Sequence, residues 1–305
     1  MLSTTRKIKN KAFDIGFDKI GIANPHIIYE DNAIYNLQNW LSLGYQADMA
    51  WMNNPKRFDI TQCMPDIRSV ITVALNYYTP HKHSNNINYG KVSRYAWGKD
   101  YHKVLKQKLK LFCKWLTKKN IKTVCYVDTG PIQEKVWAER SGIGWIAKNG
   151  NIITKEFGSW VFLGVVLTNL SLISDTPHVK HCGACRRCID ICPTKAIVSP
   201  FVVDSRRCIA YHTIENKSEN LPEYIVNNLN GWVAGCDLCQ DVCPWNQRFS
   251  QETNIQDFYP YPGNISLHLE EISNLTEIQW QQKFSSSSLK RIKAKAWRRN
   301  ADANL

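Results

Sequence analysis

The apolar positions of several segments recur every three to four residues, a spacing that predicts amphipathic helices. We expect three such helices over residues 4–17, 32–45 and 100–120, and a shorter one over residues 133–142 that Gly142 closes. The helix over residues 100–120 has the clearest pattern, because lysines occupy the face opposite its apolar side chains. That apolar face consists of Val104, Leu105, Leu109, Phe112, Trp115 and Leu116.

Shorter runs of β-branched and apolar residues between these helices predict strands. They lie at residues 18–25, 68–78, 121–131 and 158–170. Helices and strands therefore alternate, without the regular βαβ order of a parallel sheet, up to about residue 175. This order predicts an α+β fold. The longest apolar run, WVFLGVVL, is far too short to cross a bilayer, so we expect no membrane contact.

The composition fits one large or two modest globular domains, with 305 residues of which 44% are hydrophobic and 21% charged. We predict a catalytic domain over residues 1–175, a cysteine-rich domain over 176–250 and a basic helical extension over 251–305. The start, MLSTTRKIKNKAFDIGF, has basic residues but no continuous apolar stretch behind them. A cytoplasmic protein is therefore the expectation.

Eleven cysteines in a compartment that keeps thiols reduced indicate metal binding or redox chemistry. Cys182, Cys185, Cys188 and Cys192, followed by Pro193, match the ferredoxin run C-x2-C-x2-C-x3-C-P. In that run three thiolates bind one four-iron cluster and the fourth binds a neighbouring cluster. A second cluster is therefore predicted.

The second cysteine run is GCDLCQDVCPWN, which repeats the last three cysteines of the pattern before Pro244. Its first position would fall at Val233, which cannot bind iron, so Cys208 is the nearest candidate for the missing ligand. The crossover rule then predicts two sets of four ligands. One set is Cys182, Cys185, Cys188 and Cys243, and the other is Cys192, Cys208, Cys236 and Cys239.

Zinc is the alternative occupant, because C-x2-C pairs also suit a tetrahedral zinc site. A single zinc ion needs only four ligands. A zinc site would therefore not explain why the cysteine–proline ending occurs twice. The remaining cysteines, Cys63, Cys113 and Cys125, lie in apolar or strand-like surroundings, and we expect them to be core residues.

Asp128 ends an apolar strand beside Thr129, Gly130 and Pro131. A carboxyl group there would be partly desolvated, with the raised pKa that a proton donor needs near neutral pH. A turn or a helix cap is the alternative explanation for this residue. Glycines at 142, 144 and 150 would let the backbone approach a flat or phosphate-bearing ligand, but neither a dinucleotide fingerprint nor a P-loop is present.

Seven motifs occur together in the order and spacing of the epoxyqueuosine reductase family, cobalamin-dependent iron–sulfur enzymes of queuosine biosynthesis. They are KVSRYAWGKDYH, VDTGP, ERSGIGWIAKNGNII, GSWVFLGVVLTNL, HCGACRRCIDICPTKAI, DSRRCIAYHTIE and GCDLCQDVCPWN. The resemblance covers essentially residues 1 to 300. It implies a cobalamin-binding domain related to those of reductive dehalogenases, followed by a bacterial-type ferredoxin domain with two 4Fe-4S clusters.

The family's reaction is the reduction of the epoxide of epoxyqueuosine at the wobble position of tRNA, with the aspartate of DTGP as proton donor. The resemblance therefore implies that Asp128 is catalytic. His212 is either a cobalamin contact or a hydrogen-bonding partner of the cluster loop. The residues implied to surround the cobalamin are Arg57, Ser93, Tyr95, Asp128, Lys148, Asn149, Ser159, His212, Cys236 and Asp237.

The expected partners are tRNA and an external electron donor, and we expect a monomer. A net charge of +13 suits a polyanionic substrate, and LKRIKAKAWRRN, which holds six of the basic residues, is a candidate contact. Longer family members continue into a helical-repeat domain, and we expect this chain to be a short form without it. Two rival functions are a reductive dehalogenase-like enzyme and a plain electron carrier, and the carrier leaves the first 175 residues unexplained.

Overall fold

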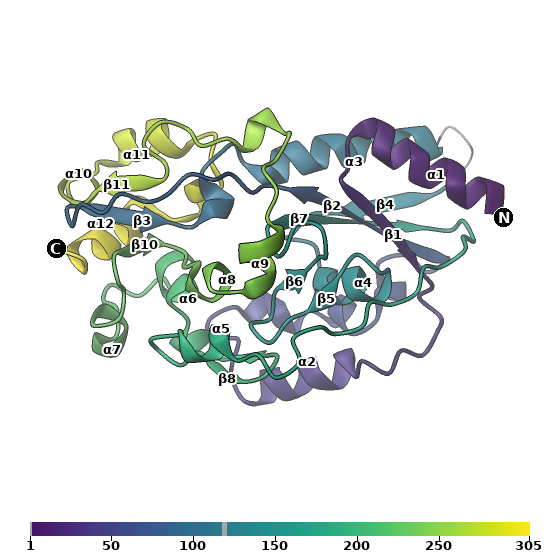
Figure 1. The fold of residues 1–305 in the computed structure, drawn as a ribbon, viewed down its shortest axis with the longest axis horizontal. Coiled ribbons are helices and arrows are strands. Elements are labelled where there is room, and N and C mark those ends of the chain that lie inside the picture. The colour runs from purple at the N-terminus through teal and green to yellow at the C-terminus, as the bar shows by residue number, and fades with distance from the viewer. Residues whose placement is uncertain (1, 118–120) are drawn as a thin grey trace.

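A four-stranded sheet organises the N-terminal half of the computed structural model, which describes residues 2–117 and 121–305 (Figure 1). Every neighbouring pair in this sheet is antiparallel. Val70, Ile71 and Val73 in its second strand are fully buried, since both faces of the sheet are covered. The strand order is β1 (Lys19–Ala23), β2 (Ser69–Asn76), β7 (Val161–Thr168) and β4 (Thr123–Tyr126).

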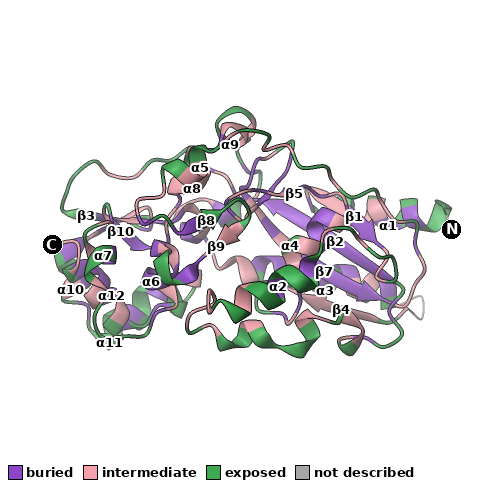
Figure 2. Cartoon of the chain, turned by 90° about the horizontal axis from the view of Figure 1, so that it is seen from below, coloured by how far each residue is buried: buried purple, intermediate pink, exposed green. Residues whose placement is uncertain are grey.

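Helices cover the two faces of this sheet, and the buried strands lie between them (Figure 2). The helices α1 (Leu2–Ile15) and α3 (Tyr101–Thr117) pack on one face, and α4 (Glu134–Arg140) packs on the other. The apolar face expected for residues 100–120 is buried, apart from the partly buried Trp115. Residues 118–120 of that predicted helix lie outside the described residues.

Shorter elements complete the N-terminal half. The pair β5 (Trp145–Ile146) and β6 (Ile152–Ile153) forms a small antiparallel hairpin beside α4. The remaining elements are α2 (Ala33–Ser42), η1 (Ala50–Asn53), η2 (Pro55–Arg57) and η3 (Ile60–Gln62).

The cysteine-rich segment consists of short helices and one small strand pair, as expected where bound groups replace an apolar core. In this segment α5 (Arg187–Asp190) and α8 (Leu238–Asp241), which carry or flank cysteines of the two runs, pack against each other. The other elements are β8 (Ile197–Ser199), β9 (Val202–Val203), η5 (Ser205–Arg207), α6 (Ile209–Ile214), α7 (Glu223–Val226) and α9 (Pro244–Phe249).

A second sheet joins three distant parts of the chain. Its middle strand β3 (Tyr89–Val92) pairs in parallel with β10 (Trp232–Ala234) and antiparallel with β11 (Ser266–His268). The predicted α+β fold is confirmed. The two predicted domain boundaries, after residues 175 and 250, stay a prediction, and this sheet contains one strand from each of the three predicted domains. Beyond these strands are η4 (Arg94–Ala96), η6 (Gln256–Phe258), α10 (Leu269–Ser273), α11 (Glu277–Phe284), η7 (Ser288–Arg291) and α12 (Ala294–Asp302).

The C-terminal helices form their own apolar core, at the end of the molecule opposite the N-terminus (Figure 1). Phe284 stacks on the fully buried Trp297, with ring centroids 4.7 Å apart. Arg299 in α12 donates to the backbone carbonyls of His212 and Ser218 at 2.8 and 2.6 Å. This cation of the basic tail therefore holds the tail against the cysteine-rich segment. Among the described residues, no helix is long and apolar enough to cross a membrane.

Candidate cluster and catalytic site

The first four-cysteine cavity, of about 240 Å³, is lined by one of the two predicted ligand sets. Lys148 closes one side of it, because its ammonium group donates to the carbonyls of Gly183 and Cys185 at 2.6 and 2.9 Å. A cation beside the cysteines stabilises the negative charge that thiolate ligands bring. The four cysteines are Cys182, Cys185, Cys188 and Cys243.

The second four-cysteine cavity, of about 440 Å³, is lined by the other predicted set. Burial raises the pKa of Cys208 and Cys239, so these thiols ionise at neutral pH only if a metal supplies positive charge. The donor set therefore suits an iron–sulfur cluster in each cavity, and the ligand assignment itself stays a prediction. The four cysteines here are Cys192, Cys208, Cys236 and Cys239.

A third cavity, which we call the acid cavity, has about 280 Å³ and contains Asp128 and Glu134. It adjoins the second four-cysteine cavity, because Tyr95, Lys135 and Gln240 line both. The carboxyl groups that could supply protons therefore lie in a cavity next to the one whose cysteines could hold an electron-transferring cluster. The rest of its lining is largely apolar and aromatic, including Tyr77, Tyr101, Ile152, Val161, Phe162 and Leu163.

Asp128 sits where the strand β4 gives way to a turn, with a φ of +53°. Aspartate tolerates this left-handed conformation better than most residues. Its side chain, which is 48% exposed, accepts from His102 with a distance of 3.0 Å between Nε2 and Oδ2. The other ring nitrogen of His102, Nδ1, lies 2.8 Å from Oδ1 of Asp100. The imidazole therefore bridges two carboxylates.

The protonation state of this pair differs from the expectation for Asp128. Burial raises the pKa of Asp128, but bonds from His102 and Tyr101 outweigh burial, and the net pKa lies below its usual value. Burial lowers the pKa of His102, yet the two carboxylates raise it to about 9 overall. At pH 7 the proton of the pair therefore resides on His102. The expected rise in the Asp128 pKa was wrong, because the sequence did not reveal these partners.

Arg57 fixes the turn that carries Asp128. Its guanidinium donates to the carbonyls of Ile132 and Gly130 at 2.8 and 3.1 Å, and Gln133 donates back to the Arg57 carbonyl at 2.9 Å. The two terminal nitrogens of the guanidinium each donate to one carbonyl, in the fixed planar geometry that distinguishes arginine from lysine. Arg57 thus positions Asp128 indirectly, by holding the backbone of the turn that follows it.

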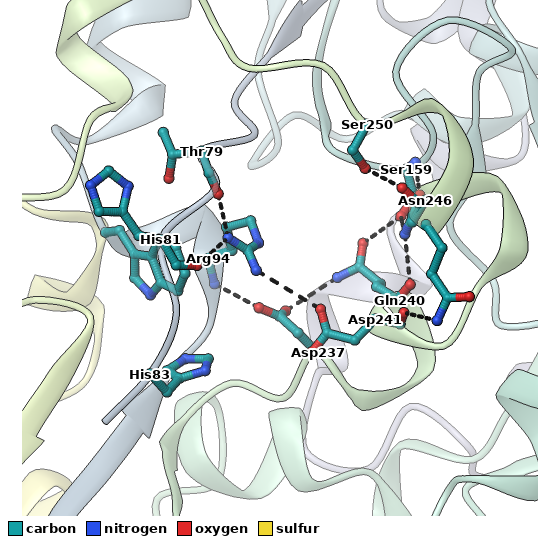
Figure 3. A network of polar contacts seen from close by, with 12 residues as sticks. Thr79, His81, His83, Arg94, Ser159, Asp237, Gln240, Asp241, Asn246 and Ser250 are labelled. Carbon is teal, nitrogen blue, oxygen red and sulfur yellow. Dashed lines mark hydrogen bonds and ion pairs between the residues drawn. The ribbon is translucent and has the colours of Figure 1, made fainter. Parts of the chain in front are cut away.

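A buried polar network joins the catalytic half to the cysteine loop (Figure 3). The backbone amide of Arg94 donates to Asp237 at 2.7 Å, and the Gln240 amide donates to the same carboxylate at 3.2 Å. Ser159 in turn donates to Gln240 at 2.9 Å and accepts from Asn246 at 2.8 Å. These bonds fix the second cysteine run against the loop that precedes β7.

The residues implied to surround a cobalamin are only partly brought together. His212 lies buried beneath the cluster loop, with Nε2 2.6 Å from the Arg206 carbonyl and Nδ1 3.0 Å from the Asn216 amide, which favours its hydrogen-bonding role. Ser159 lines the acid cavity and Lys148 the first four-cysteine cavity. Five others line the second four-cysteine cavity: Ser93, Tyr95, Asn149, Cys236 and Asp237.

Sequence reasoning missed His102, Asp100 and Glu134. His102 and Asp100 belong to KVSRYAWGKDYH, a motif whose Ser93 and Tyr95 were singled out, and Glu134 lies three residues after the last residue of VDTGP. Only the fold shows that the start of α3 lies against the end of β4. The signal available in the sequence was that Asp100 and His102, two ionisable residues, lie close together in one of the family motifs.

Away from its cysteines, the second four-cysteine cavity has walls that suit a cobalamin, as does the adjoining acid cavity. Gly235 has a φ of +74°, and a Cβ at this position would lie 2.1 Å from Ser93 Oγ, so glycine is required for the Ser93 hydroxyl to lie against this loop. Hydroxyl and amide groups of Ser93 and Asn149 stand among aromatic and aliphatic side chains. Such a mixture suits a flat macrocycle that carries amide side chains.

Two family models match the chain. One, described as "Epoxyqueuosine reductase QueG, DUF1730", matches residues 57–129, and the other, "4Fe-4S double cluster binding domain", matches residues 181–246. The first contains Asp128 and His102, and the second contains all eight predicted cluster ligands.

Relatives and solved structures extend these matches to the whole chain. The epoxyqueuosine reductase of Atelocyanobacterium thalassa is 84% identical, over all of both chains. That of Synechocystis sp. is 58% identical over 94% of this chain and 100% of the relative. A crystal structure of epoxyqueuosine reductase with an epoxyqueuosine-modified tRNA stem loop has a TM-score of 0.93 at 32% identity, and the match covers 99% of this chain and 81% of that chain.

Eight clustered cysteines, a 4Fe-4S double cluster domain and an adjoining acid cavity define an iron–sulfur oxidoreductase. The chain belongs to the epoxyqueuosine reductase family.

Proposed function

We propose that this chain reduces the epoxide of epoxyqueuosine in a tRNA anticodon loop to the alkene of queuosine, with Asp128 as proton donor. The acid cavity carries this proposal, because Asp128 opens into it and it shares walls with the second four-cysteine cavity. The solved relative that binds an epoxyqueuosine-modified stem loop supports the substrate. A further structure, from Bacillus subtilis, has its catalytic aspartate loop swung out of the active site, which supports an aspartate in this role.

The reduction consumes two electrons and two protons, breaks both carbon–oxygen bonds of the epoxide and releases the oxygen as water. When bound, cobalamin supplies strongly reducing cobalt, and the clusters supply its electrons singly. Ser93, Tyr95, Asn149 and Asp237 would hold the cobalamin.

The chain's own residues control the first proton. Asp128 passes to the substrate oxygen the proton that it shares with His102, and Asp100 holds the imidazole in line through its second nitrogen. Val161 and Phe162 form an apolar part of the wall of the cavity in which this transfer takes place.

Electrostatics favour a nucleic-acid substrate, since the net charge of +13 attracts phosphates. An unpaired base of an anticodon loop can enter a cavity that a base in a duplex cannot reach. We further propose that the enzyme acts as a monomer in the cytoplasm and takes electrons from an external donor. In this proposal residues 1–175 form the catalytic domain, residues 176–250 the ferredoxin domain and residues 251–305 the basic extension.

Nucleoside mass spectrometry tests the reaction. Protein loaded with iron, sulfide and cobalamin is incubated anaerobically with epoxyqueuosine-containing tRNA and a strong chemical reductant. Appearance of queuosine supports the proposal. Unchanged tRNA, with clusters and cobalamin shown spectroscopically to be loaded, overturns it, and small-molecule acceptors are then tested with the same protein.

A further inference from the structure

Glu134 opens the helix α4 and shares the acid cavity with Asp128. Its Oε1 atom is buried and has no hydrogen-bond partner within residues 2–117 and 121–305. The backbone amide of Asp128 donates to the same carboxyl group. A carboxyl oxygen that is removed from water and left unpaired is costly when it carries charge, and much less so in the neutral acid.

Charged and titratable groups face Glu134 from every neighbouring element. Two cations, Arg57 from η2 and His102 from α3, favour its ionised form, and Asp128 at the end of β4 opposes it. Burial is the largest effect, and together with Asp128 it raises the pKa of Glu134 to about 8. The other titratable groups that interact with Glu134 are Tyr101 of α3 and Lys135 of its own helix.

We propose that Glu134 supplies the second proton of the reduction. This inference rests on the proposed function. Asp128 protonates the epoxide oxygen as the first carbon–oxygen bond breaks, and Glu134 protonates the resulting hydroxyl group as the second bond breaks. Two electrons arrive from the external donor, the oxygen leaves as water, and the His102–Asp128 pair and Glu134 each regain one proton from solvent. The cavity thus stores both protons before the substrate arrives.

The protonation states of the neighbouring groups are consistent with two separate proton donors in the acid cavity. The proton held by His102 and Asp128 is one, and the neutral Glu134 carboxyl is the other. Lys135 is not an equivalent donor, because its ammonium group is bound to the Gly150 carbonyl at 2.8 Å and to the Asn151 side chain at 3.2 Å.

The variant Glu134→Gln tests the proposal, and Glu139→Gln is its matched control. Glu139 is a buried glutamate on the same helix, and its carboxylate accepts the amide of Ile146 at 2.8 Å, a bond that glutamine can keep. We expect Glu134→Gln to lower kcat on epoxyqueuosine tRNA by about 10²–10³-fold with an unchanged KM. Glu139→Gln should keep wild-type kcat, and Glu134→Asp should recover part of the loss.

The pH profile and an infrared titration separate proton donation from folding. Wild-type kcat should fall as the pH rises through about 8, where Glu134 loses its proton. In the infrared difference between substrate-free wild type and Glu134→Gln, the carbonyl stretch of a protonated carboxyl group should be present at neutral pH and disappear over the same range, since the other buried carboxyl groups contribute to both proteins. Equal iron content in all variants shows that they fold and bind their clusters.

Two results overturn the inference while leaving the proposed function standing. One is wild-type turnover and an unchanged pH profile in Glu134→Gln. The other is an infrared spectrum in which no carboxyl group titrates near pH 8 in a wild type that converts the tRNA. If the loaded wild type itself yields no queuosine, the proposed function fails first.

Discussion

The His102 imidazole donates to Asp128, with 3.0 Å between Nε2 and Oδ2. This contact forms because the first turn of α3 lies in space beside the C-terminal end of β4. Asp100, two residues earlier, holds the same ring from its other side at 2.8 Å. The resulting carboxylate–imidazole–carboxylate line fixes where a proton resides before the reaction. It also makes the stability of this region depend on pH.

The thermal stability of His102→Gln should differ from that of the wild type in a pH-dependent way. The folded-state pKa of His102 is about 9 against 6.5 for the free side chain, so folding favours its charged form. The stabilisation is therefore complete below pH 6.5 and is lost as the pH rises through about 9. Melting temperatures of both proteins at pH 6 and pH 9.5 measure the difference. A gap that widens with pH would contradict the assigned charge.

Replacing Asp128 by asparagine should abolish most turnover. Asparagine keeps the shape and can still accept from His102, but it cannot pass a proton on, so kcat should fall by about 10²–10⁴-fold. Queuosine formation and tRNA binding are measured side by side, and binding should be unchanged. The control is Asp66→Asn, which removes an exposed ion pair with Lys122 at 2.9 Å. Equal loss of activity in both variants would remove Asp128 from the mechanism.

Arg57→Lys should misplace the acid without unfolding the protein. The guanidinium donates to the carbonyls of Gly130 and Ile132 from a rigid planar fork, whereas lysine carries a compact ammonium group on a flexible stem and lacks this fixed geometry. We expect kcat to fall about 10-fold or more, because a small displacement of a catalytic group is costly. The exposed Arg68 provides the control variant Arg68→Lys. Wild-type kcat in Arg57→Lys would show that the turn is held by other contacts.

Much of the site could be predicted from the sequence, because thiolate ligands follow fixed local spacing. The eight cysteines fall into two cavities in the sets that the crossover pattern gave, including the isolated Cys208. Asp128 was found for a similar reason, since VDTGP is a contiguous motif. The main helices and strands followed from periodicity alone.

The remainder depends on contacts between distant segments, which periodicity does not encode. The raised pKa expected for Asp128 was wrong because its partner His102 lies on α3, 26 residues earlier in the sequence. In the sequence Glu134 was only one residue of the helix predicted over residues 133–142, and the fold is what buries its carboxyl oxygen in a cavity. Pairing of β3 with β10 and β11 likewise joins segments that no local pattern connects.

Cys208→Ser should separate the two clusters. This variant removes one ligand of the second four-cysteine cavity and leaves the first set intact, so iron content should drop towards about half. Electron paramagnetic resonance of the reduced protein should then lose the interaction between clusters. Cys63→Ser is the control, since Cys63 packs against an apolar core cluster. Full iron content in Cys208→Ser would mean that another residue completes the second cluster.

Two cations of the basic tail should respond differently to substitution. Arg299 donates to three backbone carbonyls, those of His212, Asn216 and Ser218, so Arg299→Ala should destabilise the fold by about 2 kcal/mol. Lys290 is exposed, and Lys290→Ala should leave the melting temperature unchanged.

If the tail contacts tRNA, Lys290→Ala should weaken binding and reduce the salt dependence of the affinity by about one phosphate contact. Titrations with labelled tRNA at several salt concentrations measure both quantities. An unchanged salt slope in Lys290→Ala would show that Lys290 contacts no phosphate, and Lys293→Ala then tests the next exposed cation of the tail, because Arg291 and Arg298 are already bound to Glu215 and to the Leu275 carbonyl.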